Sequence, residues 1–149
     1  MRKKIAIIIR GIPGSAKTAF ADLFSSFEGC KIHSVDDLHL DSNGDFSWNE
    51  SKSSSLYKKN LNNFSKDCEK GFPIVISDCV SYKYSHVEEY TEIAKKFGYR
   101  SYVVNSEPLS LSSSKRLNSH DVPDEKLKLF YRDWEPWPSS EKMRELIFK

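Results

Sequence analysis

The residues with the clearest chemical pattern in this chain lie between positions 11 and 18, GIPGSAKT. Their spacing matches the phosphate-binding (Walker A) pattern G-x-x-x-x-G-K-[ST], from Gly11 to Lys17-Thr18. In such a loop, backbone N–H groups surround a polyphosphate, the lysine reaches the β- and γ-phosphates, and the hydroxyl ligates Mg²⁺. The predicted ATP site consists of Gly11, Pro13, Gly14, Ser15, Ala16, Lys17 and Thr18, with Thr18 also the predicted Mg²⁺ ligand.

Position 16 departs from the pattern, because the second glycine of the motif is Ala16. Alanine is the smallest replacement, but it restricts the backbone where glycine gives latitude. An ordinary strand–turn–helix junction is therefore an alternative interpretation. The context favours a phosphate-binding loop, since an apolar run (5–9) precedes it and an amphipathic segment follows it.

Carboxylates follow two further apolar segments. Asp36 and Asp37 come directly after 30–35 (CKIHSV), and Asp78 follows 72–77 (FPIVIS). In parallel α/β sheets, ligands bind at the carboxyl ends of the strands, so we expect these side chains near the phosphate loop. Phosphoryl transfer to a hydroxyl needs a carboxylate that accepts the hydroxyl proton. The three aspartates are thus candidates for catalysis.

The elements that must position these residues alternate between strands and helices. We predict strands at 4–9, 30–35, 72–77 and 99–104, and helices at 18–28, 56–70, 85–97 and 124–134, with a serine-rich loop beyond Pro108 and a short helix in the tail. Such alternation predicts a three-layer α/β/α sandwich with a mostly parallel sheet. We expect a single P-loop kinase domain spanning residues 1–149.

Composition narrows the setting of the protein. No apolar run approaches the ~20 residues of a membrane span, so no membrane association is expected. The three cysteines are odd in number and lack metal-type spacing, which predicts a reducing, cytoplasmic location. The net charge of +2 permits a nucleic-acid partner without arguing for one.

The segment 41–50, DSNGDFSWNE, begins like a calcium-binding loop. Such a loop has glycine at its sixth position and glutamate at its twelfth, where this chain has Phe46 and Lys52. We therefore expect a turn or small hairpin around Asn43 and Gly44.

Several segments together resemble the P-loop polynucleotide kinases, namely the kinase domain of phage polynucleotide kinase and the related NEDD4-binding-protein-2 type domains. The resemblance covers most of the chain and rests on RGIPGSAKT, VDD after the second strand, GFPIVISD, AKKFGY and SKRLNSHDVPDEKL. It implies a P-loop NTPase fold of the nucleoside-kinase-like type. It also implies an ATP-dependent enzyme that phosphorylates the 5′-hydroxyl of a single-stranded nucleic acid.

The resemblance implies roles for matching residues. Asp36 matches the general base, with Asp37 as an alternative. Asp78 matches an acidic residue that orients the acceptor or a metal-bound water, although a helix cap or a hydrogen-bonded loop carboxylate would have the same sequence. Arg116 matches the lid arginine that neutralises the transferring phosphoryl group, or it is a solvated basic residue in a polar loop.

The acceptor side departs more from the family pattern. The arginine expected three residues after Asp36 is His39, and a histidine of the middle helix is Tyr57. The asparagine expected shortly after Asp78 is missing from the segment 79–81 (CVS). Tyr82 lies just beyond and either stacks on an acceptor base or packs within its own domain.

Three functions therefore stay open. The first is a polynucleotide 5′-hydroxyl kinase. The second is a kinase for a small molecule such as a nucleoside, a sugar or an antibiotic. The third is a nucleotide-binding adaptor module that has lost turnover, for which Ala16 and the altered acceptor residues argue. The sequence does not predict an oligomeric state.

Overall fold

A computed structural model of the protein describes residues 3–13, 17–39, 42–44, 50–108, 110–117 and 122–138, apart from the side chains of residues 36, 37 and 50. The predicted tail helix and the loop residues Gly14, Ser15 and Ala16 lie outside the described residues.

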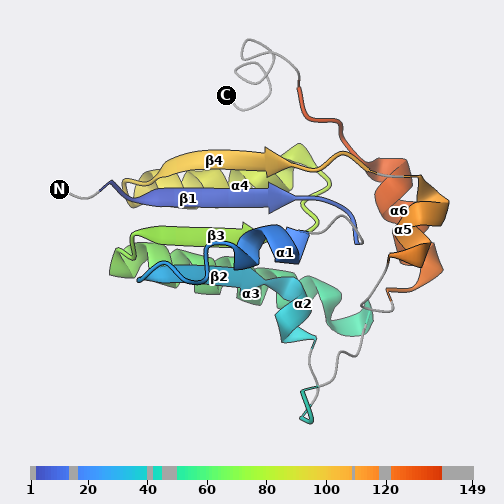
Figure 1. Ribbon diagram of the computed structural model, residues 1–149, viewed down its shortest axis with the longest axis horizontal. Coiled ribbons are helices and arrows are strands. Elements are labelled where there is room, and N and C mark those ends of the chain that lie inside the picture. Colours follow the sequence, from blue (N-terminus) through green and yellow to red (C-terminus); the bar gives the residue numbers. More distant parts are fainter. Residues whose placement is uncertain are drawn as a thin grey trace.

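Four parallel strands form the central sheet, in the order β2-β3-β1-β4 (Figure 1). The strands are β1 (Ile5–Arg10), β2 (Cys30–Ser34), β3 (Ile74–Asp78) and β4 (Arg100–Asn105). β1 lies between β3 and β4, and its residues from Ala6 to Arg10 are all buried. A strand buried on both faces has a continuous apolar sequence, which explains the run at 5–9. The predicted parallel sheet is confirmed.

Helices cover both faces of this sheet. They are α1 (Lys17–Asp22), α2 (Val35–Leu38), α3 (Ser53–Lys70), α4 (Tyr84–Lys96), α5 (Leu111–Arg116) and α6 (Asp124–Asp133), with a 3₁₀ turn at Glu50–Lys52. Figure 1 shows α3 and α4 on one face and α1 on the other, with α5 and α6 beyond the carboxyl ends of the strands. This arrangement is the expected three-layer α/β/α sandwich.

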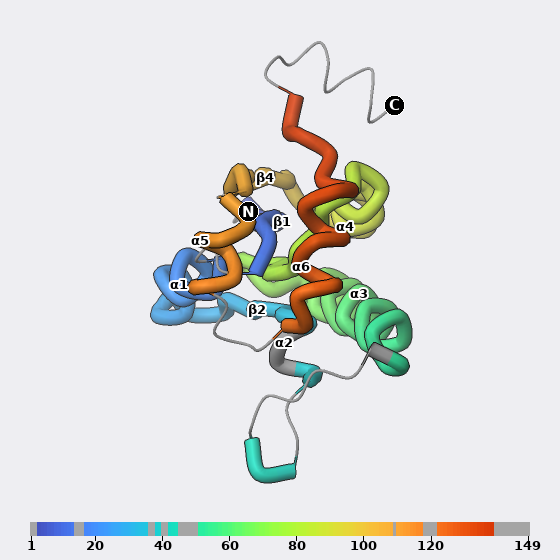
Figure 2. The backbone as a smooth tube through the Cα atoms, turned by 90° about the vertical axis from the view of Figure 1, so that its right-hand side faces the viewer, coloured from blue at the N-terminus to red at the C-terminus, as the bar shows by residue number. Residues whose placement is uncertain are grey.

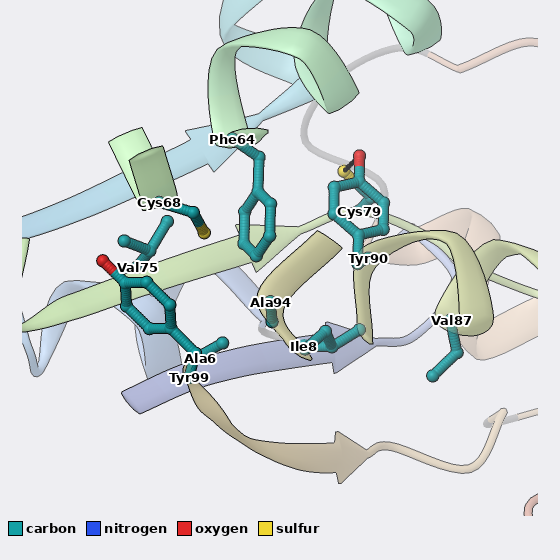
Figure 3. Packing of buried hydrophobic residues seen from close by; sticks show 10 residues of the cluster. All are labelled: Ala6, Ile8, Phe64, Cys68, Val75, Cys79, Val87, Tyr90, Ala94 and Tyr99. Carbon is teal, nitrogen blue, oxygen red and sulfur yellow. Dashed lines mark hydrogen bonds between the residues drawn. The ribbon is translucent and has the colours of Figure 1, made fainter. Parts of the chain in front are cut away.

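The main core lies between the sheet and the helix pair α3 and α4 (Figure 3). Ala6 and Ile8 of β1 face this core, whereas Ile7 and Ile9 face the α1 side, as the alternation of a strand requires. Phe64 of α3 packs edge-on against Tyr90 of α4, with ring centroids 5.0 Å apart. The core thereby packs α3 and α4 against β1, whose carboxyl end leads into the phosphate loop.

The helix after the phosphate loop is shorter than predicted. α1 ends at Asp22, and the backbone N–H groups of Leu23 and Phe24 then bond to carbonyls three residues back, which gives turns instead of an α-helix. The side chains of Leu23 and Phe27 are 69% and 56% exposed, so only some of the periodic apolar residues pack in the core. The predicted helix is therefore wrong beyond Asp22, although the chain does turn at Gly29, with φ +78°.

Two short helices lie where the sequence predicted other structure. β2 ends at Ser34, and residues 35–38 form one helical turn, so Asp36 lies in α2 and not directly after a strand. α5 occupies the predicted serine-rich loop, because the Ser110 side chain accepts a hydrogen bond from the Ser113 N–H and caps the helix. The other helices and strands agree with the prediction to within a few residues. Asn43 and Gly44 lie in the predicted turn segment.

Candidate active site

The phosphate loop leaves β1 beside the end of β3. The Gly11 N–H donates to the Val80 carbonyl at 3.1 Å, which ties the start of the loop to the chain after β3. Lys17 is the first residue of α1 and is only 7% exposed. The Thr18 hydroxyl donates to Asp78 Oδ2 at 3.0 Å. The structure therefore places the motif lysine, the motif threonine and the aspartate of the third strand side by side.

This pair of oxygen-bearing side chains suits Mg²⁺. Magnesium takes oxygen ligands and is typically held by one or two protein groups together with substrate phosphates. The hydroxyl of Thr18 and the carboxylate of Asp78 are such oxygens, and they lie next to a buried lysine that suits a phosphate. These side chains fit the Mg²⁺–ATP complex that the sequence predicts.

Three other candidate site residues are placed less directly. Asp36 and Asp37 lie in α2, whose first residue, Val35, lines the pocket described below; their side chains are outside the described part of the structure. Arg116 is the last residue of α5 and is exposed, and it does not line that pocket. The neighbouring Lys115 Nζ lies 3.4 Å from Asp124 Oδ2, an ion pair between α5 and α6.

A pocket of about 370 Å³ opens next to Lys17 and Asp78. Its walls come from the start of α3, the segment after β3, the start of α4, and α6. In Figure 2, α6 runs across this end of the molecule in front of α3 and α4. A pocket that borders both the phosphate loop and the third-strand aspartate is suitably placed for a phosphoryl acceptor.

Aromatic rings form much of the pocket wall. The Tyr82 ring centroid lies 4.9 Å from that of His86 and 5.2 Å from that of Phe130. The Tyr57 ring lies 5.4 Å from His86, and the Tyr57 hydroxyl donates to Glu89 Oε2 at 3.0 Å. Burial, and secondarily Lys83, lower the pKa of His86, so its imidazole is neutral at pH 7. The wall therefore offers flat apolar surfaces and no charge of its own.

Three other residues of the acceptor side are buried. Asn60 is buried and donates to the Tyr90 hydroxyl at 2.8 Å and to Cys79 Sγ at 3.2 Å. Burial raises the pKa of the Cys79 thiol, which keeps it protonated. His39 is buried directly after α2. The hydrogen bonds of Asn60 thus connect α3 to Tyr90 of α4 and to Cys79, which lines the pocket.

Ser81 has an unusual backbone at the edge of the pocket. Its φ of +46° lies in the left-handed region, and the residue is only 3% exposed. Its hydroxyl has no hydrogen-bond partner among the described residues, while its carbonyl accepts from Arg10 Nε at 3.0 Å. Strained residues of this kind persist where the surroundings hold them and are frequent at functional sites.

Replacing Ser81 by glycine is expected to raise the free energy of unfolding by about 1 kcal/mol, because glycine removes the left-handed strain. Ser81→Ala keeps the strain and removes only the hydroxyl, so it separates the two effects. Urea titration of both variants measures the change. A glycine variant less stable than the alanine variant would show that the backbone here is not strained.

Arg10 is the buried residue that organises this region, although no motif in the sequence predicts a role for it. Its guanidinium donates to the carbonyls of Tyr82 at 3.1 Å and Glu135 at 2.8 Å, in addition to Ser81. It also lies 4.2 Å from the centroid of the Trp134 ring. Burial lowers the pKa of Arg10, opposed by nearby Glu107, but an arginine stays protonated in proteins. The only sequence signal was a charged residue at the end of an apolar strand.

Comparison with known proteins identifies the fold of this chain but does not assign the chain to a family. No model of a known protein family matches the chain. No curated protein matches it significantly. Solved structures do match in fold, at identities between 15% and 19% for the three described next.

A chain of the Pnkp1/Rnl/Hen1 complex matches with TM-score 0.60 and 17% identity over 78% of this chain, which spans 39% of the matched chain. A gluconokinase from Sinorhizobium meliloti 1021 matches with TM-score 0.59 and 19% identity, over 95% of this chain and 80% of that one. Kti12 from Chaetomium thermophilum, in complex with ADP-AlF3, matches with TM-score 0.61 and 15% identity, over 96% and 95%. The fold is that of the P-loop kinases, as predicted.

Membrane attachment through a spanning helix finds no support in the described residues, where no helix is both long and apolar enough to cross a bilayer.

Proposed function

We propose that this protein is an ATP-dependent kinase that transfers the γ-phosphoryl group to the 5′-hydroxyl of a single-stranded nucleic acid in the cytoplasm. The observation that carries the proposal is the pocket bordered by Lys17 and Asp78, with Thr18 hydrogen-bonded to Asp78. The lysine predicted to bind phosphate thus lines a pocket large enough for an acceptor. Positioning and charge neutralisation of this kind are the main needs of phosphoryl transfer.

The proposed reaction is an in-line displacement. The acceptor oxygen forms a bond to the γ-phosphorus, the bond from that phosphorus to the bridging oxygen breaks, and ADP leaves. Asp36 accepts the hydroxyl proton, and Lys17 with the loop amides holds the donor phosphates. Mg²⁺ held through Thr18 would neutralise charge on the β- and γ-phosphates. Arg116, exposed at the end of α5, would neutralise charge on the transferring phosphoryl group.

The nucleic-acid acceptor is favoured by the aromatic wall of Tyr57, Tyr82, His86 and Phe130, because every base has a flat face that stacks on such rings. One structure of similar fold comes from the Pnkp1/Rnl/Hen1 RNA repair complex, which agrees with this choice of acceptor class. The motif order noted in the sequence favours the same choice.

A small-molecule kinase is the second candidate. The pocket volume of about 370 Å³ suits a single nucleoside or sugar as well as the end of a polymer. The fold match to a gluconokinase shows that the same scaffold occurs in a sugar kinase.

Transfer from γ-labelled ATP tests the proposal directly. A 5′-hydroxyl oligonucleotide is compared with nucleosides and sugars, and Lys17→Ala and Asp36→Asn serve as controls. Label on the oligonucleotide that both variants abolish supports the polynucleotide kinase. Label on small molecules alone selects the second candidate, and ATP binding without transfer selects a nucleotide-binding adaptor.

A further inference from the structure

The edge of the sheet opposite the phosphate loop is basic. It consists of residues 3–5, 27–31, 67–74 and 93–101, where the strands begin and where α3 and α4 end (Figure 1). Positive charge exceeds negative charge there by a larger margin than the net charge of +2 of the whole chain. The carboxylates of this edge are those of Glu28, Asp67 and Glu69, and the cations are Lys3, Lys4, Lys31, Lys95, Lys96 and Arg100, together with Lys70, which lies 4.0 Å from Asp67.

The needs of the helices account for only some of these cations. Lys95 and Lys96 lie in the last turn of α4, where a positive charge stabilises the helix dipole. Lys31 and Arg100 lie instead at the starts of β2 and β4, and a sheet has only a small net dipole. Both side chains are exposed, and neither forms an ion pair with any residue that the structure describes. These two charges are therefore available to a partner.

Aromatic rings connect the cations across the starts of the strands. Lys31 Nζ, on β2, lies 4.7 Å from the centroid of the Phe72 ring, just before β3. The Phe72 carbonyl accepts a hydrogen bond from the Tyr99 hydroxyl at 2.6 Å. Lys4 Nζ, just before β1, lies 4.8 Å from the centroid of the Tyr99 ring and donates to the Phe97 carbonyl. Cations and rings thus alternate from β2 past β3 to β1.

The same strip continues to β4 and to the end of α4. The Arg100 N–H donates to the Lys4 carbonyl at 3.0 Å, and Lys96 Nζ lies 5.3 Å from the centroid of the Phe97 ring. Neighbouring strands lie about 4.8 Å apart, so the strip from β2 to β4 is roughly 14 Å long. This length is enough for several phosphates of one nucleic-acid strand.

Tyr102 adds an exposed ring to the strip. It lies on β4, an edge strand of the sheet, and is 46% exposed. The guanidinium carbon of Arg100 lies 5.5 Å from the centroid of this ring. A nucleobase stacks on such a ring while the neighbouring cation binds the backbone. An acidic protein surface would need the cations alone, so the exposed ring favours a nucleic acid.

We propose that Lys31, Lys96, Arg100 and Tyr102 form a binding surface for single-stranded nucleic acid that is separate from the candidate active site. The three cations bind backbone phosphates, and Tyr102 stacks on a base. Because the surface lies at the opposite ends of the strands from the phosphate loop, it goes beyond the proposed function and does not require phosphoryl transfer.

Fluorescence anisotropy tests this surface with a deoxythymidine oligonucleotide that carries a dye on its 5′-oxygen. This probe has no free 5′-hydroxyl, so it cannot serve as a phosphoryl acceptor. Binding is measured over a range of salt concentrations for the wild type, for the triple variant Lys31→Gln/Lys96→Gln/Arg100→Gln and for Tyr102→Ala. Urea titration establishes that each variant is folded.

The matched control is Lys58→Gln/Lys59→Gln/Lys128→Gln, which removes the same charge from exposed lysines of α3 and α6. The control should change the affinity by less than about twofold if binding depends on the basic edge and not on net charge.

The triple variant at the basic edge is expected to bind roughly 10-fold or more weakly at about 0.1 M salt. The slope of log affinity against log salt should fall by about 2, because each phosphate contact of a single strand contributes about 0.7. Tyr102→Ala should weaken binding about fivefold or more through lost stacking and leave this slope unchanged.

A wild type that does not bind the probe, or a triple variant that binds as tightly as the control, overturns the inference. If the triple variant weakens binding, Tyr102→Ala has no effect and inorganic polyphosphate displaces the probe as readily as unlabelled oligonucleotide does, the surface recognises acidic partners in general and the nucleic-acid assignment is wrong. Transfer from γ-labelled ATP is measured separately. Its absence in the wild type would contradict the proposed function and leave the binding result standing.

Discussion

Replacing Asp78 by asparagine is expected to lower the rate of phosphoryl transfer by on the order of 10²–10³-fold, the loss typical of removing one preorganised polar group from an active site. Asp78 is buried at the end of β3, next to β1. It accepts a hydrogen bond from the Thr18 hydroxyl at 3.0 Å. Asparagine still offers a carbonyl oxygen to Thr18, so the local fold should persist. What disappears is the negative charge beside the predicted Mg²⁺ ligand.

This loss should depend on magnesium. With the carboxylate absent, half-maximal activity is expected to require a higher Mg²⁺ concentration, because a carboxylate is a stronger ligand for this ion than an amide. Initial rates over a Mg²⁺ titration at saturating ATP measure both effects. Circular dichroism and urea titration establish that the variant is folded.

Glu107→Gln provides the matched control. Glu107 also follows a strand at the carboxyl edge of the sheet, but it is exposed and accepts hydrogen bonds from Asn105 and Trp134. Its substitution should change the rate by less than about threefold. If Asp78→Asn were as active as this control, the aspartate would be a hydrogen-bonded structural carboxylate at the end of β3 without a catalytic role.

The sheet could be predicted because its signals are local. A buried parallel strand needs an apolar run such as Ile5–Ile9, and the strands alternate with helices along the whole chain. The predicted helix after the phosphate loop is too long, because the spacing of the phenylalanines indicates an apolar stripe but not where the helix ends. The helix has six residues and ends at Asp22. The α5 helix was missed because its signal is the Ser110 cap, which is hard to recognise among many serines.

The candidate site likewise contains residues that a local sequence signal predicts and residues that only the packing of the chain brings in. The phosphate-loop residues and Asp78 follow from a motif and from strand ends, and the structure places Lys17 and Thr18 beside Asp78. Lys126 and His86 carry no such signal, since each is a single residue on a helix and enters the pocket only through the packing of α4 and α6. The catalytic roles of Lys17, Asp36, Asp78 and Arg116 are predictions.

Arg10→Met is expected to lower the free energy of unfolding by ~3–5 kcal/mol, the range found when one partner of a buried charged network is removed. Arg10 is 0% exposed and donates to three backbone carbonyls and to Asn105 Oδ1. Methionine fills part of the volume but removes the guanidinium donor from the buried Ser81 carbonyl and from the part-buried Glu135 carbonyl and Asn105 Oδ1. Urea titration monitored by tryptophan fluorescence measures the loss, since Trp134 and Trp137 lie against the guanidinium.

Arg10→Lys should recover only part of this stability, because an ammonium cannot reproduce the planar fork that reaches carbonyls on two sides. Arg132→Met is the control: Arg132 is exposed and bonds only to the adjacent Asp133 among the described contacts, so its loss should cost less than about 0.5 kcal/mol. Because Arg10 holds the Ser81 and Tyr82 carbonyls, the methionine variant should also raise the acceptor KM more than the KM for ATP. A lysine variant as stable as the wild type would show that charge alone, and not the geometry of the guanidinium, holds the pocket edge in place.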